Sequence, residues 1–399
     1  MSSERKPRYL VLSSGQVFRG RAAGSRAQVR GEIVFTTAMG GYLEALSDPG
    51  LAGQILVFSF PEIGSYGLIP EDLESEQARL AGCVVRSLCD TPSNMRSAGP
   101  LEDWLIAQGI PVITDIDTRA LIRVLRRNNA LEAALCDFDP TNHSWEELTN
   151  MIQPAPVKPP QAPAAARHTA GPWRQTAADF AQNPPSWIAT LPAPLWTPER
   201  TAAERLTHVV LLDYGSKHSL AIEFLRRGVD VSSLPAAATF AQIQETKPDG
   251  IIVSGGPGDP ADYDLTILKQ LIAAGYPLFG VDLGHLLIAR AMGLETGRMR
   301  FGHRGQNHPV RDTASGLVYI TSQGHQHVVR ADSISSDIAR LEQIHSGDGS
   351  CEALRYRHVP ILTLAYHPEG GAGPRDANGQ IDRFFNLMLA HTREARHAS

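Results

Sequence analysis

From residue 206 onward, short apolar runs alternate with amphipathic stretches, and this rhythm limits the possible folds more than any other feature of the chain. "THVVLLDYG", "PDGIIVSGG" and "YPLFGVD" are typical of buried strands, whereas "SKHSLAIEFLRRG" and "LTILKQLIAAG" carry apolar residues at helical spacing. Apolar strands separated by helices predict a parallel sheet covered by helices on both faces. In such sheets, functional residues gather at the carboxyl ends of the strands.

One of these strand ends has an unusual turn. The stretch "FGVDLGHLLIAR" predicts a strand, a sharp turn and a helix, with Gly280 and Gly284 flanking Asp282. The pattern Gly-x-nucleophile-x-Gly is typical of the elbow on which hydrolases expose a reactive side chain. Such elbows usually carry Ser or Cys, so the aspartate requires an explanation.

Other parts of a catalytic site occur elsewhere in the same segment. The glycine loop from Ser254 to Pro260 offers backbone N–H groups at a neighbouring strand end. In "YHPE", His367 is a candidate base and Glu369 a carboxylate that could orient it. A nucleophile, a base, an orienting acid and an oxyanion hole are what acyl transfer through a covalent intermediate requires.

The rest of the chain divides into two further segments. Residues 8–145 mix strand patterns with helical ones such as "PLEDWLIAQGI" and "DTRALIRVLRRNN", which predicts a separate α/β domain. A proline-rich stretch beginning "PAPVKPPQAPAAA" then predicts an extended linker, whose second half we expect to pack on a domain through Trp173, Trp187 and Trp196. The predicted domains are therefore 1–150 and 206–393, joined by the linker 151–205.

Composition excludes several functional classes. The 399 residues are 42% apolar and 20% charged, as in globular proteins, with a net charge of −5 and no basic run that suits nucleic acid. We find no apolar run of membrane-spanning length and no signal-peptide core, so we expect a cytoplasmic protein. No cofactor is expected, since "SGGPGD" lacks the Gly-Lys-Ser/Thr ending of a phosphate loop. The four cysteines have no Cys-x-x-Cys spacing and are expected to be reduced.

The motifs and their order resemble class I glutamine amidotransferases, and most closely the small, glutamine-hydrolysing subunit of carbamoyl phosphate synthetase. "GEIVFTTAMGGY" and "DIDTRALIRVLR" in the first domain, and "GPGDP", "FGHRGQNHPV" and "HPE…GPRDA" in the second, are similar to that family. The resemblance covers nearly the whole chain apart from the linker. It implies an N-terminal small-subunit domain followed by a class I amidotransferase domain.

The resemblance also implies roles for individual residues. In that family a cysteine attacks the glutamine amide with help from His and Glu, and the released ammonia travels to a large synthetase subunit. By position, the nucleophile is residue 282, the base is His367 and its partner is Glu369. The oxyanion loop then runs through Gly256 to Gly258, together with the amide of Leu283.

The sequence departs from the family at the substrate pocket. Asp282 replaces the nucleophilic cysteine. Other pocket positions are also substituted. Leu286 stands in place of Gln and Ala38 in place of Ser, and Gly324, Gln326 and His327 replace the residues that hold the two ends of the glutamine backbone. The framework motifs survive around a changed pocket, which favours loss of glutamine hydrolysis.

Three interpretations of Asp282 remain open. It could serve an active glutaminase, although a carboxylate attacking an amide would form an anhydride uphill of the amide. It could serve a hydrolase with a better leaving group. We favour a structural role, because Asp tolerates strained backbone and a helix N-terminus stabilises its charge by roughly 0.3–1 kcal/mol.

The histidines of two motifs also invite a metal-site interpretation. His303 and His308 lie in "GHRGQNH", and His325 and His327 in "GHQH" could join His367. The resemblance instead makes the first motif a packed segment near the partner subunit, and we interpret the others as solvated or core histidines. No metal is therefore expected.

Two hypotheses of different class follow. The first is a glutaminase-deficient small-subunit homologue that binds an ammonia-using large subunit as a heterodimer or larger assembly, in the pathway to arginine and pyrimidines. The second is an enzyme in its own right, either a working amidotransferase subunit or a repurposed hydrolase using Asp282. Retained framework motifs around an altered pocket favour the first.

Overall fold

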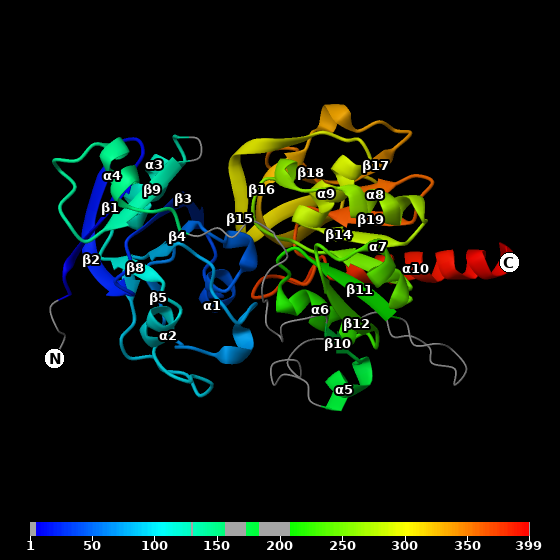
Figure 1. Cartoon of the computed structure of the whole chain (residues 1–399), viewed down its shortest axis with the longest axis horizontal. Coiled ribbons are helices and arrows are strands. Elements are labelled where there is room, and N and C mark those ends of the chain that lie inside the picture. Colours follow the sequence, from blue (N-terminus) through cyan, green and yellow to red (C-terminus); the bar gives the residue numbers. More distant parts are fainter. Residues whose placement is uncertain (1–4, 129–130, 156–172, 183–207, 399) are drawn as a thin grey trace. The chain divides into compact units, whose positions relative to one another are not determined.

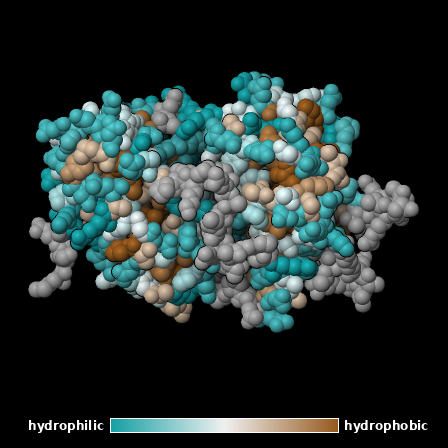
Figure 2. Space-filling view, in the orientation of Figure 1, coloured by the Kyte–Doolittle hydropathy of each residue, from teal (hydrophilic) through white to brown (hydrophobic). Residues whose placement is uncertain are grey.

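The computed structural model describes residues 5–128, 131–155, 173–182 and 208–398. The chain forms two compact units, Met1–Lys158 and Pro159–Ser399, which are described separately below (Figure 1). In the part of the chain that the structure describes, no helix combines the length and the apolar character that crossing a membrane requires. On the face drawn in Figure 2, hydrophobic residues lie in small groups among hydrophilic ones.

The N-terminal unit is built on a closed seven-stranded barrel with the order β1-β2-β8-β6-β4-β3-β9. β9 closes the barrel by pairing antiparallel with both β1 and β3, while β3, β4, β6 and β8 run parallel to one another. The strands are β1 Pro7–Leu12, β2 Val17–Gly24, β3 Val29–Thr36, β4 Ile55–Phe58, β6 Gly82–Val84, β8 Pro111–Thr114 and β9 Leu131–Cys136; a separate parallel pair is β5 Glu62–Ile63 with β7 Ser87–Leu88.

Short helices cover this barrel, and their starts follow from capping residues. Asp117 accepts a hydrogen bond from the backbone N–H of Ala120 at the start of α3, and Ser144 forms a capping box with Glu147 at the start of α4. The helices are α1 Tyr42–Leu46, α2 Leu101–Ala107, α3 Thr118–Leu125 and α4 Trp145–Met151, with 3-10 turns at Pro49–Leu51 and Pro70–Asp72. The helices expected in "PLEDWLIAQGI" and "DTRALIRVLRRNN" are confirmed, but the sequence pattern did not predict a barrel.

The C-terminal unit contains a ten-stranded sheet with the order β10-β12-β11-β13-β14-β19-β18-β17-β15-β16. The five strands from β12 to β19 are parallel, as expected, but the strands beyond them on either side are antiparallel. The strands are β10 Trp173–Gln175, β11 His208–Asp213, β12 Asp230–Pro235, β13 Gly250–Val253, β14 Leu278–Val281, β15 Thr296–Asp312, β16 Val318–Val329, β17 Ala339–His345, β18 Cys351–Tyr356 and β19 Ile361–Leu364.

Successive residues of the central strands feed two separate cores, which explains their continuous apolar runs. Val209 and Leu211 of β11 pack into a cluster that includes side chains of α6 and α10, whereas Val210 and Leu212 pack into a cluster with α7, α8 and α9. The helices are α6 His218–Leu225, α7 Phe240–Glu245, α8 Thr266–Ala273, α9 Leu283–Ala291 and α10 Gly379–Ala398, with 3-10 turns at Pro260–Asp262 and Ala331–Ser333. Helices therefore cover both faces of the parallel part of the sheet.

Most of the expected linker, including Trp187 and Trp196, lies outside the described residues. Within the described part, Trp173–Gln175 forms β10 and pairs antiparallel with β12. Ala177–Gln182 forms the short helix α5, whose Phe180 is buried in the core of the unit. Regular structure is thus present inside a segment that we expected to be extended.

Candidate functional site

The elbow predicted around Asp282 is confirmed. Asp282 lies between β14 and α9 with φ 52° and ψ −113°, a backbone conformation that L-residues rarely adopt. A Cβ on Gly280 would lie 2.8 Å from the carbonyl oxygen of Gly284, and a Cβ on Gly284 would lie 2.0 Å from that of Val253. Both glycines are therefore required by close packing of the backbone at the turn.

The side chain of Asp282 lies against the glycine loop that follows β13. It is buried, with 7% of its surface exposed, and a Cβ on Gly255 would lie 2.8 Å from its Oδ2 atom. The backbone N–H of Asp282 donates to Leu364 at the end of β19, at 2.8 Å. Because Asp282 precedes the first turn of α9, the helix N-terminus favours its negative charge.

His367 and Glu369 follow the adjacent strand, β19. His367 Nδ1 is 2.9 Å from Glu369 Oε1, and both side chains are buried. Burial and the charge of Lys217 act to lower the pKa of His367, but the carboxylates of Glu369 and Asp282 outweigh them and raise it. The two carboxylates therefore stabilise the protonated form of His367, whereas a general base must be neutral before it can accept a proton.

We expect a Glu369→Gln variant to lower the pKa of His367, because it removes the carboxylate that lies 2.9 Å from its Nδ1. In the wild type, protonated His367 stabilises the fold because its pKa is higher in the folded chain than in the unfolded one. This contribution is fully present below the unfolded-state pKa of about 6.5 and is lost as the pH rises through the folded-state pKa. The variant should lose less stability over the same rise in pH. NMR titration of the His367 ring proton and denaturation at several pH values measure both effects; a titration that matches that of the surface control Glu245→Gln would contradict the expectation.

The glycine loop after β13 is held from several sides. The Ser254 hydroxyl accepts a hydrogen bond from the backbone N–H of Tyr214 at 2.9 Å, and the Tyr263 hydroxyl donates to the carbonyl of Pro257. A Cβ on Gly256 would lie 2.4 Å from the carbonyl oxygen of Tyr214, and Gly258 has φ 92°. The loop thus has a fixed backbone next to Asp282, at the position expected for an oxyanion hole.

The remaining predicted pocket residues are engaged with the protein itself. Gln326 Oε1 accepts a hydrogen bond from Arg304 at 2.7 Å, and His327 Nε2 lies 3.4 Å from Asp259 Oδ2 of the glycine loop. Gly324 is paired across the β15–β16 ladder, and Leu283 and Leu286 are buried in the apolar cluster beneath α9. Ala38 belongs to the N-terminal unit, where it follows β3 and its N–H donates to Thr36 Oγ1. All of these positions except Ala38 therefore belong to the C-terminal unit, and among them the side chain of His327 lies near the glycine loop.

Two residues near the site were not predicted. Lys217 precedes α6 at the carboxyl end of β11, and its positive charge acts to lower the pKa of His367. His285, in the first turn of α9, is fully buried with its Nδ1 2.8 Å from Thr363 Oγ1, and burial lowers its pKa to about 3. The position of Lys217 in the short turn between an apolar strand and a helix was the available signal.

Comparisons with known proteins agree along the chain. Residues 10–135 match the family model described as carbamoyl-phosphate synthase small chain, CPSase domain, and residues 210–387 match glutamine amidotransferase class-I. The carbamoyl phosphate synthase small chain of Bacillus caldolyticus is 38% identical over 382 residues, 96% of each chain. The carbamoyl phosphate synthase pyrimidine-specific small chain of Bacillus subtilis is 36% identical over 388 residues, 97% of each chain.

Proposed function

This chain belongs to the carbamoyl-phosphate synthase small chain family, and we propose that it is a cytoplasmic member that has lost glutamine hydrolysis and supports a large subunit running on ammonia. A relative named as pyrimidine-specific supports a place in the supply of carbamoyl phosphate for pyrimidines. Arginine synthesis is the other use of that product.

The observation that carries this proposal is the aspartate at the elbow. Its carboxylate lies beside the glycine loop at the position that the resemblance assigns to the nucleophile, and its charge helps to raise the pKa of His367. Attack of a carboxylate on an amide would give an anhydride, which is less stable than the amide itself. A charge pair between Asp282 and His367 therefore accounts for the residues better than a nucleophile and base do.

The contacts of the pocket positions support the same proposal. Gln326 is bonded to Arg304, and His327 lies near Asp259, so these side chains are already paired within the protein. Leu286 contributes to an apolar core. A glutamine backbone, with its charged amino and carboxylate groups, requires polar partners that are free to bind it.

We expect the purified chain to release no ammonia from glutamine, and we expect Asp282→Cys to remain inactive. The new thiol would sit at a helix N-terminus, which favours the thiolate. Catalysis also requires the amide to be held against that thiolate, and a misplacement of about 1 Å can cost roughly a hundredfold in rate. An ammonia-release assay of wild type, Asp282→Cys and Asp282→Ala, with and without the large subunit, measures this.

Two results would contradict this expectation in different ways. Steady glutamine hydrolysis that disappears in Asp282→Ala would mean that the aspartate is catalytic. Family-like turnover by Asp282→Cys would mean that the glutamine pocket is intact. Hydrolysis of another substrate by the wild type, lost in Asp282→Ala, would favour the repurposed hydrolase.

We also expect a stable complex with a synthetase large subunit. We base this expectation on family membership and not on the retained motifs, because two of those motifs make contacts within the chain itself. In "GPRDA", Arg375 pairs with the buried Glu223, and "FGHRGQNHPV" lies within β15. Co-expression with the large chain of the same genome should give one species in gel filtration, since a lasting interface buries well over ~1,000 Å².

The co-expressed complex should make carbamoyl phosphate from ammonia, bicarbonate and ATP but not from glutamine. Separate elution of the two chains at micromolar concentration, with the large chain alone folded and active, would contradict the partnership. Synthesis from glutamine would contradict the loss of hydrolysis and leave the partnership standing.

A further inference from the structure

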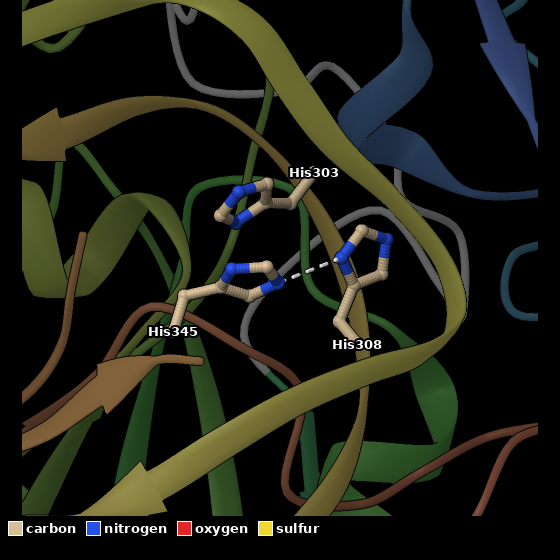
Figure 3. A group of neighbouring side chains, drawn as sticks. All are labelled: His303, His308 and His345. Carbon is tan, nitrogen blue, oxygen red and sulfur yellow. Dashed lines mark hydrogen bonds between the residues drawn. The ribbon is translucent and has the colours of Figure 1, made fainter. Parts of the chain in front are cut away.

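Three histidines that are distant in sequence meet beside the long strand β15. His303 and His308 come from β15 itself, and His345 is the last residue of β17 (Figure 3). Each offers one ring nitrogen, and these three atoms lie within 4.8 Å of one another. His303 is buried and the other two are partly buried, so the cluster is shielded but reachable from solvent.

The spacing of two of these nitrogens suits a shared metal ion. His308 Nδ1 lies 3.3 Å from His345 Nε2. Two imidazole nitrogens bound to a tetrahedral zinc ion at about 2.0–2.1 Å are about 3.3–3.4 Å apart. The ring of His303 stacks on that of His345 with centroids 4.1 Å apart, and one of its nitrogens lies within 4.8 Å of the ligand atoms of the other two histidines.

Carboxylates lie behind the histidines in the arrangement common around bound metals. His345 Nδ1 lies 3.3 Å from Asp348 Oδ1, on the side of the ring away from His308. Both nitrogens of His303 face carboxylates, Asp348 at 2.9 Å and the fully buried Glu352 at 3.3 Å. Such carboxylates orient a metal-binding imidazole.

A second group, formed by His303, His325 and Glu352, is a weaker candidate. His325 Nδ1 is 2.8 Å from the carbonyl of His327, and its Nε2 is 3.2 Å from Gln323 Oε1. Glu352 also accepts a hydrogen bond from Gln323. The ring nitrogens of His325 are therefore occupied, whereas the first group directs Nδ1 of His308 and Nε2 of His345 at each other.

We propose that His303, His308 and His345 bind a divalent transition ion of the zinc class. His303 exchanges one of its two carboxylate contacts for the ion, and water completes a tetrahedral set. The pairing of β15 with β16 shifts register between Gly305 and His308, so the ion would fix an irregular part of β15 to the turn after β17. The site is separate from the elbow and does not depend on the proposed function.

The test uses the full chain without a histidine tag, stripped with chelator and titrated with Zn²⁺ against a chromophoric competitor. We expect one ion per chain, visible absorption bands of tetrahedral Co²⁺ on cobalt substitution, and a higher melting temperature with Zn²⁺. His308→Asn and His345→Asn should each weaken Zn²⁺ binding at least about tenfold, and Asp348→Asn by about tenfold. His358→Asn is the matched control, because His358 is exposed and its φ of 62° suits Asn.

Circular dichroism of the metal-free variants shows which of them fold. Only the Zn²⁺ affinities of the folded variants are then compared with that of the wild type. Absence of saturable one-to-one Zn²⁺ binding by the wild type would overturn the proposal. So would a Zn²⁺ affinity in the His308 and His345 variants that equals the affinity of the wild type. In either case the 3.3 Å contact between His308 and His345 is a simple hydrogen bond between imidazoles. Equal weakening in His358→Asn would show that binding is adventitious, and would also overturn it.

Discussion

Replacing Gly284 with alanine is expected to abolish stable folding of the C-terminal unit or to displace α9 from the sheet. The added Cβ would lie 2.0 Å from the carbonyl oxygen of Val253, and both partners are backbone in regular elements. Neither β13 nor α9 can shift without moving the cores that they share, so the loss should reach about 3 kcal/mol or more. Soluble yield and chemical denaturation measure it.

Gly379→Ala provides the matched control for this substitution. Gly379 starts α10, and a Cβ built on it meets no atom within 4 Å. Alanine there should be neutral or should stabilise the protein by about 0.4–1 kcal/mol. If Gly284→Ala unfolded at the same denaturant concentration as Gly379→Ala, the close approach of helix and strand at the elbow would not be needed.

The second large effect is expected at Glu223, a buried carboxylate at the centre of an ionic network. It pairs with Arg227, whose side chain is fully buried, at 2.6 Å, and also with Arg226 and Arg375. Asn378 bonds to both Glu223 and Arg227. Arg227 also pairs with Asp382 at 2.7 Å, so Glu223→Ala would leave it one carboxylate but would remove the carboxylate that it shares with Arg226 and Arg375. Removing one partner of a buried ion pair typically costs about 3–5 kcal/mol.

Glu245→Ala on the exposed end of α7 is the control, and we expect a change within about 0.5 kcal/mol. The arginines outweigh burial and lower the pKa of Glu223, so its contribution to stability is present above the unfolded carboxyl pKa and is lost as the pH falls. The difference between wild type and Glu223→Ala should therefore shrink on acidification. A difference that is constant with pH would mean that the cavity, and not the charge, causes the loss.

The sequence predicted those features whose signals are local. The turn at Asp282 follows from two glycines at fixed spacing between an apolar strand and a helix, and its φ of 52° confirms the strained conformation expected there. The parallel strands follow from continuous apolar runs, because residues such as Leu211 and Leu212 enter cores on opposite faces. Each pattern is contained in about a dozen neighbouring residues.

Features set by distant partners were missed. β15 reads "TGRMRFGHRGQNHPVRD", which has no regular alternation because its pairing with β16 is interrupted and much of its surface is polar. The spacing of His303 and His308 suggested a metal site that we did not expect, and His345 joins them only through the pairing of β15 with β17, which no spacing in the sequence indicates. Likewise, Arg375 in "GPRDA" pairs with Glu223 of α6, which is distant from it in the sequence.

The closure of the N-terminal barrel has a consequence for synthesis of the protein. Tyr9 of β1 lies opposite Cys136 of β9, and β9 also pairs with β3. One strand late in the sequence therefore completes the pairing of two strands early in the sequence. Until that strand leaves the ribosome, β1 and β3 each present an unpaired edge, the kind of surface on which chains aggregate. The hairpin of β1 and β2 can form at once, but the barrel must wait for residue 136 and then form its most distant contacts last.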